Sequence, residues 1–296
     1  MGSFENFFNG IRYGIVPPKK KDAAECRLEA RNALRGRWGL AVGAGLLALL
    51  LGGVGDSGSF SFNFDTSSID IEDATIEIGN EFLVAFSAIF ALAALSAILI
   101  SILVSGVVRV GYEKFNLDLL QGKGKIETLF DFFKNGHYKS TVLLALRHTL
   151  VMFLYALPLS FVFGLFFGMA FASAIAAEGD LVFAATGLLA GSTFTLLLLI
   201  PAALLMIVGA YRYSMSFRIY AENPNLTARE AMDASAAMMK GHKWELFCLN
   251  FSFIGWYFLA ALTFGVGMIW VIPYSQAACA SFYRNVSLRY KHGYAD

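Results

Sequence analysis

Long apolar stretches alternate with short polar segments along most of the chain. Four stretches with few or no charges cover about 38–55, 82–108, 148–177 and 181–211. A helix needs about 20 apolar residues to cross the hydrocarbon of a bilayer, so each stretch is long enough for one transmembrane helix. We therefore predict four membrane-spanning helices before residue 212.

A fifth apolar stretch, residues 244–283, is too long for a single span. Its middle contains Gly265 and Gly267, and glycines between two apolar runs favour a turn. We expect two shorter spans, about 244–264 and 267–284, joined by a tight outer hairpin turn. The predicted number of spans is then six.

The positive charges sort to one side of this arrangement. All 23 Lys and Arg residues fall in the segments that a six-span chain places inside, which are 1–37, 109–147, 212–243 and 284–296. Cytoplasmic loops are enriched in Lys and Arg, so we predict both termini in the cytoplasm. The chain then divides into a leader (1–37), a transmembrane bundle (38–284), an outer loop (56–81) and a tail (285–296).

The outer loop 56–81 is strongly acidic, with seven Asp and Glu residues and no base. Phe60, Phe62 and Phe64 alternate with polar residues, and a period of two predicts a small β-hairpin. The acids would attract a cationic peptide or a metal ion. Solvation of a translocated loop is the simpler interpretation.

Three inner segments share a base, a glycine and an aromatic ring in the same order. They are Arg35-Gly36-Arg37-Trp38, Lys134-Asn135-Gly136-His137-Tyr138 and Lys240-Gly241-His242-Lys243-Trp244. Glycine suits the C-cap of a helix, so each segment predicts a helix end followed by a turn into the membrane. We interpret them as three copies of one unit, a surface helix followed by a transmembrane hairpin. Alternatively, any inner helix start favours these residue types at the interface.

Each of these glycines follows a candidate amphipathic helix. Helical spacing of i, i+3, i+4 and i+7 occurs at Ile126, Leu129, Phe130 and Phe133, and again at Ala228, Ala231, Met232 and Ser235. Two helix starts have the spacing of a capping box, at Asp22 with Glu25 and at Thr227 with Glu230. The fold prediction is an all-α membrane protein with six transmembrane helices in three hairpins, each hairpin preceded by a cytoplasmic amphipathic helix.

The last third of the chain carries a string of distinctive motifs. They are Tyr211-Arg212-Tyr213-Ser214-Met215, Ala221-Glu222-Asn223-Pro224, Phe251-Ser252-Phe253-Ile254-Gly255-Trp256, and Pro273-Tyr274 with Phe282-Tyr283. On these motifs the chain, from about Ala24 to Tyr283, resembles the bacterial integral membrane family catalogued as domain of unknown function 975. Ala202 departs from it, because glycine is expected after Pro201, and the bend there should be less pronounced. The resemblance implies a six-span fold in the bacterial cell membrane and no defined activity.

Residues with catalytic or metal-binding spacing do not emerge from the sequence. The histidines, His137, His148, His242 and His292, lack ligand spacing, and the sequence contains no GxSxG, HExxH or Walker loop. The three cysteines are too scattered for a disulfide framework or a metal site. We therefore expect a non-enzymatic protein without a metal or cofactor. The net charge of +1 gives no reason to expect a nucleic-acid partner.

Two groups of polar residues are candidates for function. Bases that flank the inner helix starts suit anionic lipid headgroups, and they are Arg35, Arg37, Lys134, Lys139, Arg147, Lys240 and Lys243. For Arg147, simple snorkelling to the interface is the plainer interpretation. Large polar side chains within the expected spans are Asn250, Tyr257 and Gln276, for which hydrogen bonding between helices is a simpler role than substrate binding.

Three functional hypotheses follow from these features. The first is a module that acts through membrane lipids or partner proteins, because the basic groups gather on inner surface helices. The alternative is a transporter or channel for a small or amphipathic solute, with a hydrated path lined by Asn250, Tyr257 and Gln276. A weaker alternative is protection against cationic antimicrobial peptides through the acidic outer loop.

Overall fold

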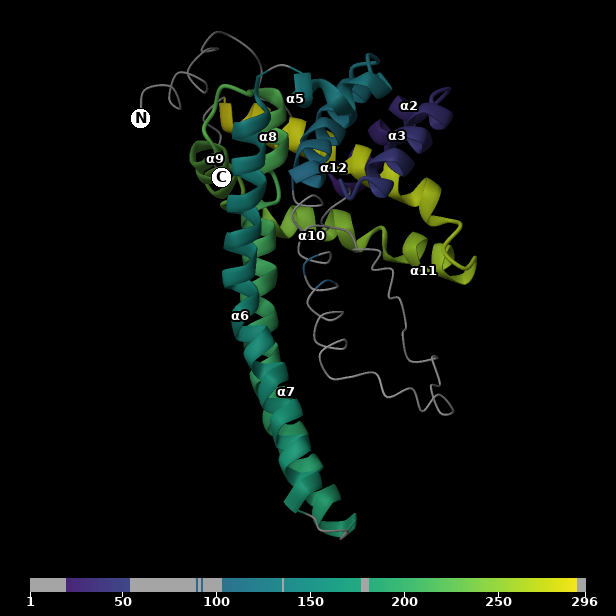
Figure 1. Ribbon diagram of the computed structural model, residues 1–296. Helices are drawn as coiled ribbons and strands as arrows, with labels where there is room; N and C mark the ends of the chain where they lie inside the picture. Colours follow the sequence, from purple (N-terminus) through teal and green to yellow (C-terminus); the bar gives the residue numbers. More distant parts are fainter. Residues whose placement is uncertain are drawn as a thin grey trace.

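All regular structure is helical in the part of the chain that the computed structural model describes (Figure 1). The described residues are 20–53, 89, 92, 103–134, 136–176 and 181–291. The acidic loop 56–81, with its expected β-hairpin, lies outside them.

The helices follow one another in chain order with short connections. They are α2 (Ala23–Leu34), α3 (Trp38–Leu50), a helix over residues 103–120, the 3₁₀ helix η1 (Ile126–Phe130), α5 (Asp131–Lys134), α6 (Tyr138–Ala176), α7 (Leu181–Tyr213), α8 (Ser216–Glu222), α9 (Ala228–Met238), α10 (Lys243–Phe251), α11 (Ile254–Leu262) and α12 (Met268–Lys291).

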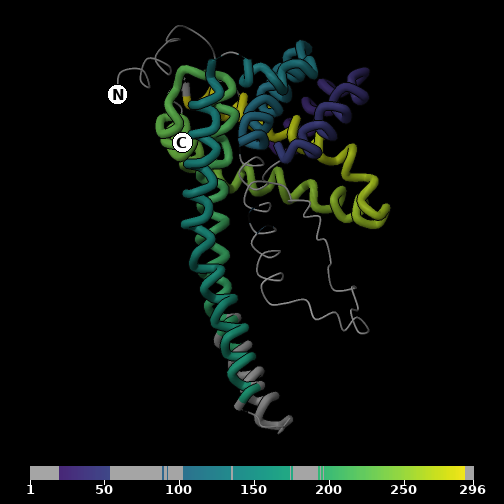
Figure 2. The backbone as a smooth tube through the Cα atoms, viewed as in Figure 1, coloured from purple at the N-terminus to yellow at the C-terminus, as the bar shows by residue number. Residues whose placement is uncertain are grey.

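The two longest helices, α6 and α7, pack side by side and extend away from the rest of the molecule (Figure 2). They contain 39 and 33 residues. At 1.5 Å per residue they are about 58 and about 50 Å long, well above the ~30 Å of a hydrocarbon core. Phe161, Phe167 and Phe171 of α6 are each at least 67% exposed, which favours a lipid environment over water.

Three of the described helical segments are long and apolar enough to cross a membrane. They are Tyr138–Ser173, Leu197–Glu222 and Lys243–Leu262. A fourth becomes possible if α2 and α3, which meet at an angle of 103°, are counted together. The 13 residues of α3 extend over about 20 Å, less than the hydrocarbon thickness. The fold is therefore that of a helical protein compatible with a membrane, and the count of six spans stays a prediction.

The expected turn within residues 244–283 is confirmed. Gly265 and Phe264 have φ angles of 85° and 52° between α11 and α12, so the chain reverses in the left-handed region. A second break, between α10 and α11, was not expected. There the hydroxyl of Ser252 donates a hydrogen bond of 2.6 Å to the carbonyl of Leu249, which offers the backbone a local alternative to the helix.

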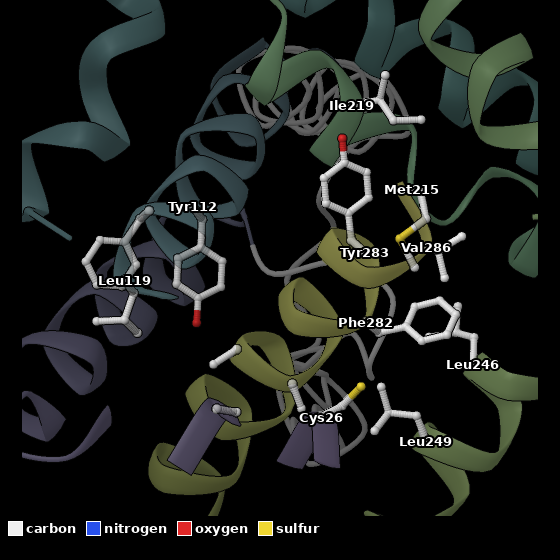
Figure 3. Close-up of a cluster of buried hydrophobic side chains, with 14 of the residues drawn as sticks. Cys26, Tyr112, Leu119, Met215, Ile219, Leu246, Leu249, Phe282, Tyr283 and Val286 are labelled. Carbon is white, nitrogen blue, oxygen red and sulfur yellow. The ribbon is translucent and has the colours of Figure 1, made fainter. Parts of the chain in front are cut away.

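The main hydrophobic core surrounds α12. Figure 3 shows Phe282 and Tyr283 of this helix among side chains from several others, including Leu246, Leu249 and Met215. Helix α2 packs on α12 through Cys26, Ala30 and Leu34, and α3 adds Ala41, Ala44 and Ala48. A second cluster joins α5, α6, α8 and α9 to helix 103–120. The short helices are therefore held by core packing rather than by their own length.

The predicted face of α9 is confirmed, because Ala228, Ala231, Met232 and Ser235 are all buried. The capping box at its start is also present, since the backbone N–H of Thr227 donates to the Glu230 carboxylate at 2.9 Å.

The predicted helix before Gly136 differs from the expectation. Residues 126–134 form η1 and then the single turn of α5, not one amphipathic α-helix. A 3₁₀ helix has three residues per turn, so Leu129 and Phe132 share the buried face while Ile126 and Phe133 are exposed.

Candidate functional site

Three glycine junctions connect a short polar helix to the start of a more apolar one. Gly36, Gly136 and Gly241 have φ angles of 77°, 72° and 91°, so the predicted glycine turns are confirmed. The junctions lie between α2 and α3, between α5 and α6, and between α9 and α10. An L-residue with a side chain is disfavoured in this conformation, which explains why glycine occupies all three positions.

Most of the bases predicted to contact headgroups face outward at or near these junctions. The exposed ones are Arg35, Lys134, Lys139, Arg147 and Lys240. Lys243 is partly exposed. Arg37 instead lies against the turn at Gly122, where an added Cβ would be 3.3 Å from its guanidinium. Exposure leaves the outward bases available to an external anion.

The first junction contains a groove of about 590 Å³ on the outside of the α2–α3 elbow. The described residues that line it are Leu28, Arg31, Asn32, Arg35, Gly36 and Trp38. We call it the elbow groove. It combines two guanidinium groups with an exposed leucine and a tryptophan ring, and no acid is among these lining residues.

A neighbouring groove of about 750 Å³ lies between α2 and α12 and has mixed charge. Glu29 is its centre, and it pairs with Lys21 at 2.5 Å and with Arg284. Ser281 also donates a hydrogen bond to Glu29. Burial, followed by the charge of Arg284, lowers the pKa of Lys21. These groups satisfy one another, so this groove serves to attach α2 to α12.

A second carboxylate hub, Glu245, ties the third junction to the end of α12. It pairs with Lys20 at 2.9 Å, with His242 at 3.2 Å and with Arg289 at 3.6 Å. At the second junction Asp131 pairs with Lys114 at 3.0 Å. Acids therefore accompany the second and third junctions.

The three polar residues expected within spans each bond two helices. The amide of Asn250 on α10 donates to the hydroxyl of Tyr211 on α7 at 3.4 Å. The hydroxyl of Tyr257 on α11 donates to Ser275 on α12 at 3.0 Å. This is the arrangement that interhelical hydrogen bonding predicts, and the side chains do not form one cluster.

The third of these residues, Gln276, belongs to a buried charged centre that sequence reasoning missed. Arg218 of α8 donates to Gln276 at 2.8 Å and pairs with Glu113 of helix 103–120 at 2.9 Å between Nε and Oε2. Glu113, Arg218 and Gln276 are each only 5% exposed. Arg218 follows the apolar Phe217 and precedes Ile219. A base flanked in this way was the available signal of burial.

His148 and Arg147, at the start of the third expected span, have different surroundings. Arg147 is exposed, whereas His148 is buried with its ring 4.8 Å from that of Phe217. Arg109 lies over the same Phe217 ring at 4.1 Å. The two neighbours therefore do not act as one site. In the described part of the chain, no group of three or more His, Cys, Asp or Glu side chains has the geometry to hold a metal ion.

Comparison with known proteins places the chain in a family context only. A family model described as "Protein of unknown function (DUF975)" matches residues 20–290. No curated protein and no solved structure matches.

Proposed function

The chain belongs to the DUF975 family of proteins of unknown function, and on that premise we propose that it is a non-enzymatic membrane module that acts by binding anionic lipid at its cytoplasmic face. The observation that carries this proposal is the division of its polar groups. Buried ones such as Arg218 and Gln276 bond other parts of the protein, whereas bases at the glycine junctions face outward. Outward bases beside apolar helices suit an anionic membrane surface.

The proposed setting is the bacterial cell membrane, with six spans, both termini in the cytoplasm and three repeated units of surface helix plus hairpin. The shared glycine geometry of the three junctions and the sorting of all 23 bases support it. A reporter fused after Asp296, or inserted near Gly122, should report the cytoplasm, and one near Ser67 the exterior. An exterior C-terminus would exclude the six-span arrangement.

Lipid binding is tested directly with the full-length protein. The protein is reconstituted in equal amounts of phosphatidylglycerol and phosphatidylcholine, extracted with a mild detergent, and its bound lipids are quantified by mass spectrometry. We expect enrichment of phosphatidylglycerol that weakens as salt is added, because basic groups near an anionic surface are screened within about a Debye length. An unchanged lipid ratio would refute the proposal and leave partner proteins as the better interpretation.

A transporter for a small or amphipathic solute is the second candidate. The Glu113–Arg218 pair favours it, because buried ionisable residues in membrane proteins frequently mark substrate or ion pathways. A Gln276→Cys variant in a background without the native cysteines separates the two candidates. Labelling by a membrane-impermeant thiol reagent would indicate a hydrated path, whereas a packed module predicts protection.

A further inference from the structure

We propose that the elbow groove between α2 and α3 binds the phosphate headgroup of one anionic membrane lipid, through Arg31 and Arg35. This inference rests on the proposed function and assigns its binding site. The groove holds about 590 Å³ and is lined by both arginines and by Asn32. Guanidinium groups donate paired hydrogen bonds that match the geometry of a phosphate, and an amide adds a further donor.

The depth of the elbow in the membrane follows from the two helices that form it. Helix α2 carries four charged residues, whereas α3 carries none. The charged helix belongs in the headgroup region and the uncharged one in hydrocarbon, and the 103° bend between them sets the boundary. Trp38 begins α3 at this boundary, as tryptophan does at membrane interfaces. The elbow groove therefore lies at the level of lipid phosphates.

The two arginines are free to take an external anion. Both are exposed, and neither has an ion-pair partner among the described residues. The acids nearest to them on α2 are already engaged. Glu25 accepts the backbone N–H of Asp22 at 3.1 Å, and Glu29 pairs with Lys21 and Arg284.

Charge separates the elbow groove from the other two junctions. Glu245 collects bases at the third junction, and Asp131 accompanies the second. The neighbouring groove between α2 and α12 contains Glu25 and Glu29 and would repel an anion. The elbow groove alone among these sites combines two guanidinium groups with a lining, as described, that includes no carboxylate.

An apolar groove continues along the same face of α3. Trp38, Gly45 and Leu49 are spaced i, i+7 and i+11, so they share one side of the helix. Gly45 and Leu49 line a cavity of about 310 Å³, which Met268 and Ile272 of α12 close on the other side. A lipid held by its phosphate at the elbow has a place there for an acyl chain.

The test compares charge-matched double variants of the full-length protein in detergent. The apparent affinity for phosphatidylglycerol is measured by native mass spectrometry as the lipid is titrated. Each base near an anionic group contributes roughly a fivefold factor, so Arg31→Gln with Arg35→Gln should weaken binding about 30-fold. The control, Lys134→Gln with Lys240→Gln, removes two exposed bases from the other junctions and should retain most of the affinity.

A second variant keeps the protein's charge and tests the geometry. Arg31→Lys with Arg35→Lys should bind with intermediate affinity, because lysine lacks the planar fork that pairs with a phosphate. Inorganic phosphate at millimolar concentration should leave the bound lipid in place, and its displacement would overturn the assignment to a lipid.

The outcomes distinguish this site from the general function. Equal losses in the glutamine variants of both sets of bases would show diffuse attraction, which retains lipid binding and excludes the elbow site. Wild-type protein without preference for phosphatidylglycerol over phosphatidylcholine would exclude both. Full affinity in the Arg31→Gln and Arg35→Gln variant would exclude the elbow site alone.

Discussion

The buried pair of Glu113 and Arg218 offers the sharpest test of how the polar interior is organised. Replacing Arg218 with Met leaves the Glu113 carboxylate buried without its cation and removes the donor to Gln276. Breaking a buried ion pair by removing one partner costs about 3–5 kcal/mol. The lost hydrogen bond to Gln276 is part of that cost and amounts to about 1 kcal/mol.

Replacing both partners should cost far less than replacing Arg218 alone. In the double variant, Glu113→Leu with Arg218→Met, no buried charge remains, so only the loss at Gln276 and the change in packing persist. We expect its free energy of unfolding to lie within about 2 kcal/mol of the parent protein. The coupling energy of the cycle should therefore be large and favourable, because the two side chains contact each other directly.

The assay is reversible denaturation of the full-length protein in mixed micelles, with increasing amounts of a denaturing detergent and helix content measured by circular dichroism. The four proteins of the cycle are the parent, Glu113→Leu, Arg218→Met and the double variant. Additive losses, with the double variant less stable than either single one, would show that the two charges do not stabilise each other. An Arg218→Met variant as stable as the parent would refute the burial argument itself.

Three further predictions test local features. Gly36→Ala should destabilise the protein by about 1–2 kcal/mol, because φ is 77° there, whereas Gly39→Ala in the following helix should be neutral or stabilising; neither added Cβ meets a neighbour within 4 Å, so thermal unfolding isolates the backbone effect. Gly111→Ala should be severely destabilising, because its Cβ would lie 2.2 Å from the carbonyl oxygen of Leu129, and a normal yield of folded protein on gel filtration would contradict this close approach. Burial raises the pKa of Asp118, so its charged form is disfavoured in the folded state; Asp118→Asn should increase stability at neutral pH, with a gain that shrinks as the pH falls through the carboxyl range, and a loss of stability would be the opposite result.

Several features could be predicted from the sequence because they depend on neighbouring residues alone. A positive φ angle at Gly36, Gly136 and Gly241 follows from the absence of a Cβ between a helix end and an aromatic helix start. The buried face of α9 and its capping box follow from helical periodicity and from side chains three residues apart.

The same local rules failed where two backbone geometries compete. Residues 126–134 are spaced for an α-helix, yet packing selected a 3₁₀ turn that buries Leu129 with Phe132. The break at Ser252 similarly depends on a side-chain hydrogen bond that competes with the backbone ladder. Periodicity indicates which residues are apolar, but it does not decide between geometries of similar energy.

The tertiary structure alone decided which charges are consumed and which remain available. Glu29 contacts Arg284, 255 residues further along the chain, and Arg218 is buried against Glu113 rather than exposed on an inner segment. Sequence sorting places all bases on one side of a membrane, because translocation responds to the number of positive charges near each span. Pairing depends instead on which helices pack together, so only the fold distinguishes Arg218, which is held by a carboxylate, from Arg31 and Arg35, which face outward at the elbow.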